Sequence, residues 1–237
     1  MTEVHLPADS ANLTLIEVEQ LTRVDSSTQQ TILQSVNLTV EERNRVGLCG
    51  PSGSGKSSLL RAIACLDPCQ SGSVRFRGET LTPEQIPSYR SRVVYLPQRA
   101  VIFEGTVREN LAIPFSLQRS EQTYDEEIAI QQLSHFDRNE DFLCKNADTL
   151  SGGEQQIIAW IRCFMMNPNV ILFDEPTTGL DSEARSKFED AVDHWFETPC
   201  INSKAFIWAS HDADQLTRLS NRRISMNRGK LEMCLES

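Results

Sequence analysis

A glycine-rich stretch limits the fold and the chemistry of this chain more than any other part of its sequence. It follows an apolar run, residues 46–49, that is typical of a buried strand, and it precedes residues 59–64, which favour a helix. The stretch consists of Gly50, Pro51, Ser52, Gly53, Ser54, Gly55, Lys56, Ser57 and Ser58. A turn of this composition between a strand and a helix is typical of a phosphate-binding loop. The alternative, a glycine-rich surface loop without a ligand, is disfavoured by the flanking strand and helix.

Physical chemistry gives the residues of this loop distinct roles. Glycines allow the backbone to curl with its amides pointing inward, where a Cβ atom would obstruct a phosphate. The amides of residues 53–58 then face the anion at the positive end of the following helix. We expect Lys56 to bridge the β- and γ-phosphates and the Ser57 hydroxyl to hold Mg²⁺. The sequence therefore predicts a nucleotide site.

A second apolar run, residues 170–173, ends in two carboxylates, Asp174 and Glu175. A buried strand in an α/β sheet presents such groups at its carboxyl end, where these sheets bind ligands. We expect Asp174 to hold Mg²⁺ through water and Glu175 to act as the base that polarises an attacking water. The alternative is a pair of carboxylates that caps a helix, although Pro176 follows directly.

Residues 150–154 (LSGGE) open a stretch with helical spacing of apolar residues. A serine N-cap followed by two glycines leaves free amides at a positive helix end, which favours a second anion site. An N-cap role explains Ser151 by itself. It does not explain Gly152 and Gly153, because glycine lowers helix stability.

Composition excludes several classes of protein. The chain has 237 residues, enough for one large α/β domain or two small ones, and no apolar run approaches the ~20 residues of a membrane span. Its net charge of −10 lowers the expectation of a nucleic-acid partner. Residues 1–12 are polar and read as a flexible lead-in without a secretory signal.

Seven scattered cysteines favour reduced thiols over a disulfide framework, with a metal or redox role for Cys65 and Cys69 as the alternative.

The order of the expected elements indicates an α/β protein with an insertion. Two alternating strands, residues 13–21 and 32–40, predict an antiparallel pair before the phosphate loop. The further elements lie later in the chain. Strands are expected at 73–77, 93–96, 170–173 and 205–209, with short ones around Ile224 and Leu231, and helices at 106–111, 124–136, 182–196 and 212–219. Residues 99–166 contain no strand pattern and read as an all-helical insertion.

Taken in chain order, these motifs resemble those of the ATPase subunit of ABC transporters, in a likeness that spans nearly the whole chain. The residues that carry it are 50–58, Gln98, 150–154, 170–175, Asp181 and His211, and the LSGG sequence is specific to that superfamily. Residues 96–107 and 109–111 also look like the small bacterial ATPases of the Ybb/Fet type, which are associated with iron export.

The resemblance implies roles for three further residues. Gln98 matches the glutamine that touches Mg²⁺ and the attacking water and senses the transmembrane partner. Asp181 matches a loop that contacts the other protomer of a dimer. His211 matches the histidine that holds the γ-phosphate and orders the water, although a histidine after a strand can also be purely structural.

These assignments form one predicted site. The expected catalytic residues are Glu175, His211, Gln98 and Lys56, and the expected metal ligands are Ser57, Gln98 and Asp174. The residues expected to bind the nucleotide are 50–58, Ser151, Gly152, Gly153, Glu154 and Asp181. The family's geometry is head-to-tail, so that Ser151 and Gly153 of one protomer close over ATP held by Lys56 of the other.

The resemblance also implies the fold class and the partners. It implies a single domain over residues 13–237, with a RecA-like P-loop core and a mostly parallel sheet, an N-terminal antiparallel β subdomain and an inserted α-helical subdomain. The expected activity is hydrolysis of ATP with Mg²⁺, by a peripheral subunit on the cytoplasmic face of the inner or plasma membrane that drives a separate permease, with iron or another metal as the exported substrate. Two alternatives stay open, namely a soluble ABC-type ATPase uncoupled from transport and a module that binds nucleotide without turnover.

The sequence departs from the family pattern at three positions. Glu154 replaces a frequent glutamine, and Ile157 replaces a frequent arginine, which should alter a surface contact and not the chemistry. Residues 22–31 lack the aromatic residue on which the family stacks adenine, and Val24 lies near the expected place. Residues 101–103 either line a groove for the permease's coupling helix or belong to the core of the insertion.

Overall fold

The computed structural model describes residues 13–116, 123–198 and 203–233. The expected flexible lead-in, residues 1–12, lies outside this part of the chain. No helix in the described ranges is long and apolar enough to cross a lipid bilayer.

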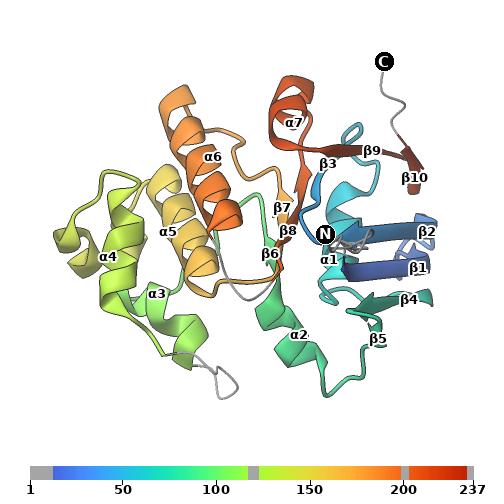
Figure 1. The fold of residues 1–237 in the computed structure, drawn as a ribbon, viewed down its shortest axis with the longest axis horizontal. Coiled ribbons are helices and arrows are strands. Elements are labelled where there is room, and N and C mark those ends of the chain that lie inside the picture. Colours follow the sequence, from blue (N-terminus) through green and yellow to red (C-terminus); the bar gives the residue numbers. More distant parts are fainter. Residues whose placement is uncertain (1–12, 117–122, 199–202, 234–237) are drawn as a thin grey trace, which may run out of the picture.

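A six-stranded sheet forms the centre of the molecule (Figure 1). Its strands follow the order β10-β9-β3-β8-β7-β6, and all neighbours are parallel except β10 and β9. The strands are β3 (Arg45–Cys49), β6 (Val93–Leu96), β7 (Val170–Asp174), β8 (Ala205–Ala209), β9 (Arg222–Asn227) and β10 (Lys230–Met233). Because β3, β6, β7 and β8 are parallel, the segments that follow them leave the sheet at the same edge.

A second, antiparallel sheet lies beside the first, in the order β2-β1-β4-β5. Its strands are β1 (Thr14–Val24), β2 (Thr31–Glu41), β4 (Ser71–Phe76) and β5 (Glu79–Thr80). The predicted pairing of the first two strands is confirmed, since Val18 faces Leu38 across an antiparallel ladder. Alternating burial along both strands supports the argument from their sequence pattern.

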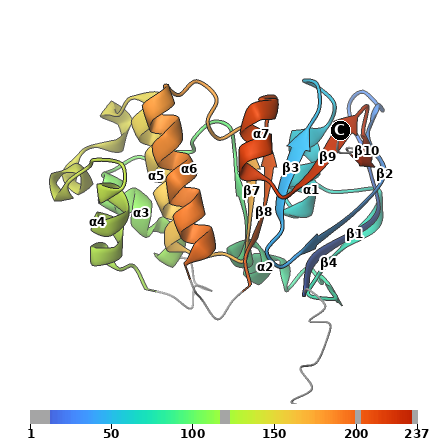
Figure 2. The same ribbon diagram turned by 45° about the horizontal axis from the view of Figure 1, so that its top comes forward.

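Helices cover both faces of the central sheet, as Figure 2 shows. On one face, α1 (Lys56–Ile63) packs between the two sheets, in a core that contains Val170 and Leu172 of β7. On the other face, α5 (Gly152–Met165) and α6 (Ser182–Glu197) pack over Ile171 and Phe173. Successive side chains of a strand point to opposite faces, so α1 and α5 lie on opposite sides of β7. A short helix, α7 (Ala213–Leu219), follows β8.

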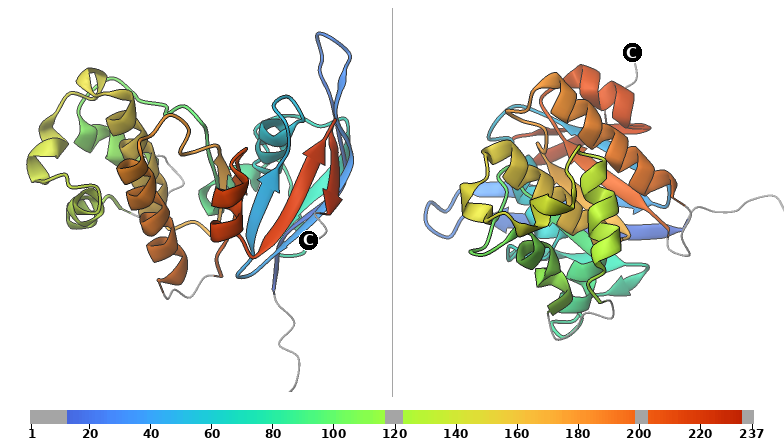
Figure 3. Two further views of the ribbon diagram at one scale, coloured as in Figure 1. Left: turned by 90° about the horizontal axis from the view of Figure 1, so that it is seen from above. Right: turned by 90° about the vertical axis from the view of Figure 1, so that its left-hand side faces the viewer.

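The insertion between β6 and β7 is helical, as predicted, and lies at the end of the molecule remote from the antiparallel sheet (Figure 3). Its helices are α3 (Val107–Ser116), α4 (Glu126–Ser134) and α5, with two 3₁₀ turns, Glu140–Cys144 and Ala147–Thr149. The Trp160 ring stacks on Phe188 of α6 with centroids 3.8 Å apart, which anchors the insertion to the core. The fold class expected from the sequence is therefore confirmed. One further helix, α2 (Ile86–Arg92), was not predicted.

The described cysteines form no disulfide, and they differ in exposure. Cys163 is buried in α5, and burial raises the pKa of its thiol to about 12. Burial likewise raises the pKa values of Cys65 and Cys69. Since the thiolate is the reactive form, these three thiols are poor nucleophiles at neutral pH. Cys200 and Cys234 lie outside the described residues.

Candidate functional site

The glycine-rich loop joins β3 to α1, as its sequence predicts. Gly50, Gly53 and Gly55 have φ angles of 141°, 75° and 111°, which L side chains rarely adopt. At Gly50 a Cβ atom would also lie 2.3 Å from the carbonyl oxygen of Met226, so this position excludes any other residue. The loop therefore curls against β9 and delivers the chain to the first turn of α1.

Lys56 and Ser57 open α1 and face the carboxylates at the end of β7. The Lys56 ammonium donates hydrogen bonds to the carbonyl oxygens of Gly50 (2.7 Å) and Pro51 (3.3 Å). It also lies 3.9 Å from Oε1 of Glu175. Ser57 Oγ donates a 3.0 Å hydrogen bond to Oδ1 of Asp174. Residues far apart in the sequence thus meet at the carboxyl edge of the sheet.

Asp174 ends β7 and is only 5% exposed. Its second oxygen, Oδ2, accepts a 2.8 Å hydrogen bond from the Tyr95 hydroxyl of β6. Burial, together with this hydrogen bond to Asp174, raises the pKa of Tyr95 well above its usual value. Tyr95 is therefore a stable donor at neutral pH, and both oxygens of the buried carboxylate have partners.

Glu175 turns away from the strand with a φ of 48°, in the left-handed region. Its amide donates to the carbonyl oxygen of Ala209 at 3.0 Å, which fixes this conformation. Non-glycine residues in this region cost about 1–3 kcal/mol and cluster at functional sites. The turn separates the two neighbouring carboxylates, so that Glu175 faces Lys56 and His211.

His211 follows β8 and is mostly exposed, with Nδ1 3.3 Å from Oε2 of Glu175. Thr178 Oγ1 donates to the same carboxylate oxygen at 3.3 Å. Gln98, two residues after the end of β6, is also exposed. The structure therefore brings Lys56, Ser57, Asp174, Glu175 and His211 together, while Gln98 only follows the neighbouring strand.

Ser151 caps α5 in the way its sequence predicts. Its Oγ accepts from the Glu154 amide, and the Glu154 carboxylate accepts from the Ser151 amide at 3.1 Å, which forms a capping box. Partial burial raises the pKa of Glu154, but the hydrogen bonds from Ser151 and the nearby Lys145 and Arg138 outweigh this effect and lower it overall.

The two glycines of this helix tip are not required by packing within the chain. No heavy atom lies within 4 Å of the position that a Cβ atom would take on Gly152 or Gly153. Both residues are exposed, at the positive end of a 14-residue helix. The tip therefore presents an open surface with free amides, which suits an anion supplied from outside this fold.

The predicted site residues fall into two groups in space. Because α1 and α5 lie on opposite faces of β7, Ser151, Gly152, Gly153 and Glu154 are separated from Lys56 by the sheet. Asp181 takes part in none of the contacts at Glu175. It caps α6, accepting from the Ala184 amide at 2.8 Å, and is exposed.

Two residues differ from the expectations of the sequence. Ile157 was expected to alter a surface contact, but it is 8% exposed and belongs to the hydrophobic core around α5, because it lies on a buried face of the helix. Tyr95 was missed as a site residue. Within the apolar run of β6 its sequence context is that of a core residue, and no motif marks its hydroxyl.

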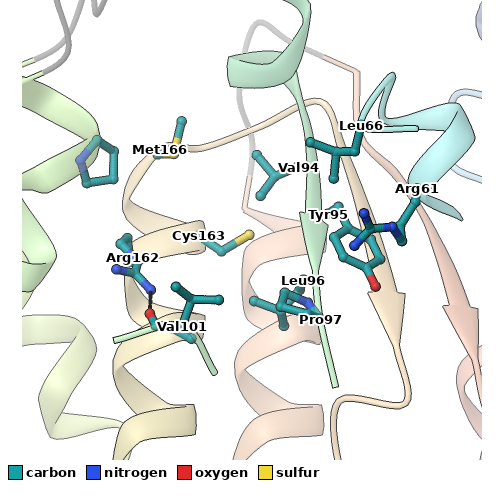
Figure 4. Close-up of a pocket in the computed structure, with 12 residues that line it drawn as sticks. Arg61, Leu66, Val94, Tyr95, Leu96, Pro97, Val101, Arg162, Cys163 and Met166 are labelled. Atoms are coloured by element: carbon teal, nitrogen blue, oxygen red, sulfur yellow. Dashed lines mark hydrogen bonds between the residues drawn. The ribbon is translucent and has the colours of Figure 1, made fainter. Parts of the chain in front are cut away.

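An apolar groove of about 400 Å³ opens between α1, β6 and α5 (Figure 4). Its lining residues are mostly apolar, with two arginines at its sides: Arg61, Leu66, Val94, Tyr95, Leu96, Pro97, Val101, Pro114, Ala159, Arg162, Cys163 and Met166. Residues 101–103 were expected either to line a groove or to belong to the core of the insertion, and the three residues differ in this respect. Val101 lines the groove and is 54% exposed, whereas Ile102 packs against the core. Phe103 is exposed and lies under the Arg162 guanidinium.

Comparisons with known proteins identify the family and the fold. Residues 33–178 match the family described as ABC transporter. The "Probable iron export ATP-binding protein FetA" of Escherichia coli (strain K12) is 32% identical over 78% of this chain and 80% of its own length. The "Fe(3+) ions import ATP-binding protein FbpC 2" of Pectobacterium atrosepticum is 30% identical over 90% of this chain and 61% of its own length. A dimeric post-hydrolysis structure of the ATP-binding cassette MJ0796 with ADP and Pi superposes with a TM-score of 0.80 at 26% identity, covering 94% of this chain and all of that one.

Proposed function

The chain belongs to the ABC transporter family, and from this premise we propose that it is an ATPase subunit whose turnover drives a separate membrane-spanning permease. One observation carries the proposal. Lys56, Ser57, Asp174, Glu175 and His211 come from α1, β7 and the segment after β8, yet they meet in contacts of 3.0–3.9 Å beside a glycine-rich loop. These residue types in this arrangement would hold a triphosphate, a metal ion and a water molecule for phosphoryl transfer.

The loop supplies the positive field for the phosphates. Its amides lie at the start of α1, where the helix dipole favours an anion. Lys56 donates to carbonyl oxygens of its own loop, and its ammonium has the charge and the reach to take phosphate oxygens in their place. We therefore assign Lys56 to the β- and γ-phosphates of ATP.

The donor set at Asp174 fits Mg²⁺. Mg²⁺ prefers oxygen ligands and takes only one or two from the protein, the rest coming from phosphates and water. Ser57 Oγ and Asp174 Oδ1 are oxygens 3.0 Å apart, and the described residues contain no cluster of three or more His, Cys, Asp and Glu that would favour a different metal. When bound, Mg²⁺ neutralises charge on the phosphates. Ser57 and Asp174 would hold it, with Gln98 as a further ligand from the adjoining segment.

Glu175 is the group placed to accept a proton from water. Its carboxylate is 18% exposed, it is held by Thr178, and its Oε1 faces Lys56. His211 lies at the other oxygen, Oε2, and can orient both the carboxylate and a water molecule in front of it. These two residues supply the orientation that hydrolysis needs, while Lys56 stabilises the charge on the transferred phosphoryl group.

A second copy of the chain would complete the site. The tip of α5 has free amides and two glycines that leave its surface open, yet it lies on the face of the sheet opposite α1. In a head-to-tail pair, Ser151, Gly152 and Gly153 of one copy would cover the triphosphate bound by Lys56 of the other. Asp181, exposed at the start of α6, would lie at the same interface.

The groove beside β6 is the proposed docking site for the permease. It is apolar and adjoins Gln98, and it exposes Val101 at its edge. A helix from a membrane protein would fit such a surface, and this supports our proposal that the subunit works at the cytoplasmic face of the membrane. We propose a metal ion as the transported substrate on the likeness to FetA, and export as its direction. FbpC 2 is described as an Fe(3+) import protein, so uptake is the alternative direction. Transport measurements must distinguish export from uptake.

The experiment that tests the proposal is a steady-state ATPase assay of the wild type and of Glu175→Gln. Loss of the proton acceptor should lower phosphate release by a factor of about 10²–10⁴, while ATP binding is retained. Glu183→Gln, at an exposed glutamate paired with Lys187, is the matched control and should keep the wild-type rate. Equal rates for Glu175→Gln and the wild type would contradict the assignment, and absence of turnover in the wild type would favour a nucleotide-binding module.

A further inference from the structure

Tyr95 belongs to two features of the molecule at once. Its hydroxyl donates to Oδ2 of Asp174 at 2.8 Å, and its side chain lines the apolar groove. Figure 4 places the Tyr95 ring on the wall of the groove beside Arg61. The carboxylate proposed to hold Mg²⁺ therefore has a direct hydrogen bond to a residue that a docked helix would touch.

The two oxygens of Asp174 are held from different elements. Ser57 of α1 donates to Oδ1 at 3.0 Å, and Tyr95 of β6 donates to Oδ2. Partners of this kind orient a metal-binding carboxylate, and their removal typically weakens metal binding. Since Ser57 is itself an expected metal ligand, Tyr95 is the donor that can hold the carboxylate while the metal is bound.

The Tyr95 side chain that connects the groove to Asp174 is rigid. The Tyr95 ring has few rotatable bonds, so a shift of the ring moves its hydroxyl. Arg61 lines the same groove, pairs with Asp67 at 2.8 Å and lies close enough to the Tyr95 hydroxyl to affect its pKa. An occupant that contacts Arg61 and the Tyr95 ring would therefore act on this hydroxyl through the ring and through the Arg61 charge.

We propose that Tyr95 is a positioning residue that transmits occupancy of the groove to the Asp174 carboxylate, and thereby changes how tightly the metal–nucleotide pair is held. This inference rests on the proposed function, in which Asp174 holds Mg²⁺ and the groove receives a helix of the permease.

The first test is the Tyr95→Phe variant, which removes the hydroxyl and keeps the ring. The readout is the ratio of ATP affinity with Mg²⁺ to ATP affinity in EDTA, measured with a fluorescent ATP analogue on the isolated chain. The ratio should fall about ten-fold, with the affinity in EDTA unchanged. An unchanged ratio would overturn the proposal.

Tyr89→Phe is the matched control for the loss of a tyrosine hydroxyl. Tyr89 is buried, and its hydroxyl donates to the carbonyl oxygen of Ile63 at 2.6 Å, away from Asp174. The control should lower the thermal midpoint and leave the Mg²⁺ ratio unchanged. An equal fall in both variants would mean that Tyr95 has only a structural role.

The link to the groove is tested by Leu66→Trp, which adds an indole ring to the groove wall at a residue that is 40% exposed. It should change the Mg²⁺ ratio in the wild-type background and have no further effect in the Tyr95→Phe background. Leu13→Trp, at an exposed leucine that does not line the groove, should change neither. Additive effects of Leu66→Trp and Tyr95→Phe, or no effect of Leu66→Trp, would overturn the transmission through Tyr95.

The two proposals fail in different ways. If Mg²⁺ does not strengthen ATP binding in the wild type, the metal assignment of the proposed function fails. If Mg²⁺ strengthens binding equally in the wild type and in Tyr95→Phe, the proposed function stands and only the role of Tyr95 is lost.

Discussion

Glu175 is the residue at which backbone and chemistry are most closely connected. Its left-handed φ of 48° points its carboxylate away from Asp174, although the two residues are neighbours in the chain. The hydrogen bond from its amide to Ala209 ties this turn to β8, from which His211 follows two residues later. The sheet thus holds a strain of about 1–3 kcal/mol, and this conformation separates the carboxylate proposed to bind Mg²⁺ from the proposed proton acceptor.

At the same scale, we expect weak discrimination between nucleotide bases. No aromatic residue occurs in residues 22–31, and Val24, at the end of β1, offers only apolar contact in place of stacking worth ~1–3 kcal/mol. The measurement is the affinity for ATP against that for GTP, and a strong preference for ATP would contradict the expectation. Val24→Tyr should tighten the binding of both nucleotides roughly five-fold.

The local structure of the proposed site could be predicted where it depends on neighbours in sequence. The loop around Lys56, the carboxylates after β7 and the cap at Ser151 depend on spacing within a few residues, and all three are found in the expected local structure. Tyr95 and Ile157 could not be read in this way. Their roles depend on which neighbour lies across the sheet or on which face of α5 they fall, and the sequence does not specify these tertiary contacts.

At the scale of elements, α5 begins with two residues that lower the stability of the helix. Glycine is the poorest helix former after proline, yet Gly152 and Gly153 open this helix without any contact that would exclude a methyl group. Ser151 and Glu154 compensate through the capping box. The element is therefore kept open at its tip at a cost in its own stability.

Gly153→Ala should accordingly stabilise the isolated chain and weaken its function. The added methyl group has open space, so we expect a gain of about 0.5–1 kcal/mol in the free energy of unfolding, together with weaker ATP-dependent association. Denaturant unfolding and light scattering measure the two effects. Gly47→Ala is the contrasting control, because its Cβ would lie 2.8 Å from Ser220 Oγ and should destabilise the fold. A stabilised variant with unimpaired association would contradict this role of Gly153.

The junction of α4 and α6 should make stability depend on pH. The His135 ring packs at 5.3 Å from the ring of His194, beside Lys187 and Asp190, with Asp137 bound to Lys187. Burial, and then the nearby His194, lower the pKa of His135 below 6.5. The unfolded chain therefore takes up a proton first as the pH falls through 6.5, and stability falls with it.

Unfolding measured between pH 7.5 and 5.5 checks this expectation. The range is chosen to bracket the usual pKa of about 6.5 for histidine. His135→Gln should show a flatter dependence of the unfolding free energy on pH than the wild type. The same slope in both proteins would contradict a contribution from His135.

Helices and strands could be predicted where the pattern of apolar and polar residues extends over enough positions to show its period. The eleven-residue strands β1 and β2 alternate in burial, and α6 agrees with its expected range to within one residue. The helix α2 was missed because its seven residues, IPSYRSR, bury only Tyr89 and carry no apolar stripe. The N-cap Asp125 also places the start of α4 at Glu126, two residues after the expected start.

At the scale of the whole molecule, the proposed site is divided between two faces. The helix α1, which Lys56 opens, lies on the side of β7 that faces the antiparallel sheet, and α5 lies on the other side with the insertion (Figure 2). Only the family resemblance implied this division. The motifs taken one by one do not give it, because it depends on which residues of β7 point to which face. One chain therefore holds the two halves of a site apart, and two chains in head-to-tail contact would bring them together.

Light scattering on Glu175→Gln with ATP and Mg²⁺ tests this account most directly. Because the variant should bind ATP without hydrolysing it, we expect its mass to double when ATP is added and to return to that of one chain with ADP. Gly153→Asp, which adds a carboxylate to the tip of α5, should abolish the doubling in the Glu175→Gln background without loss of ATP binding. A variant that binds ATP and retains the mass of a single chain would contradict the shared site.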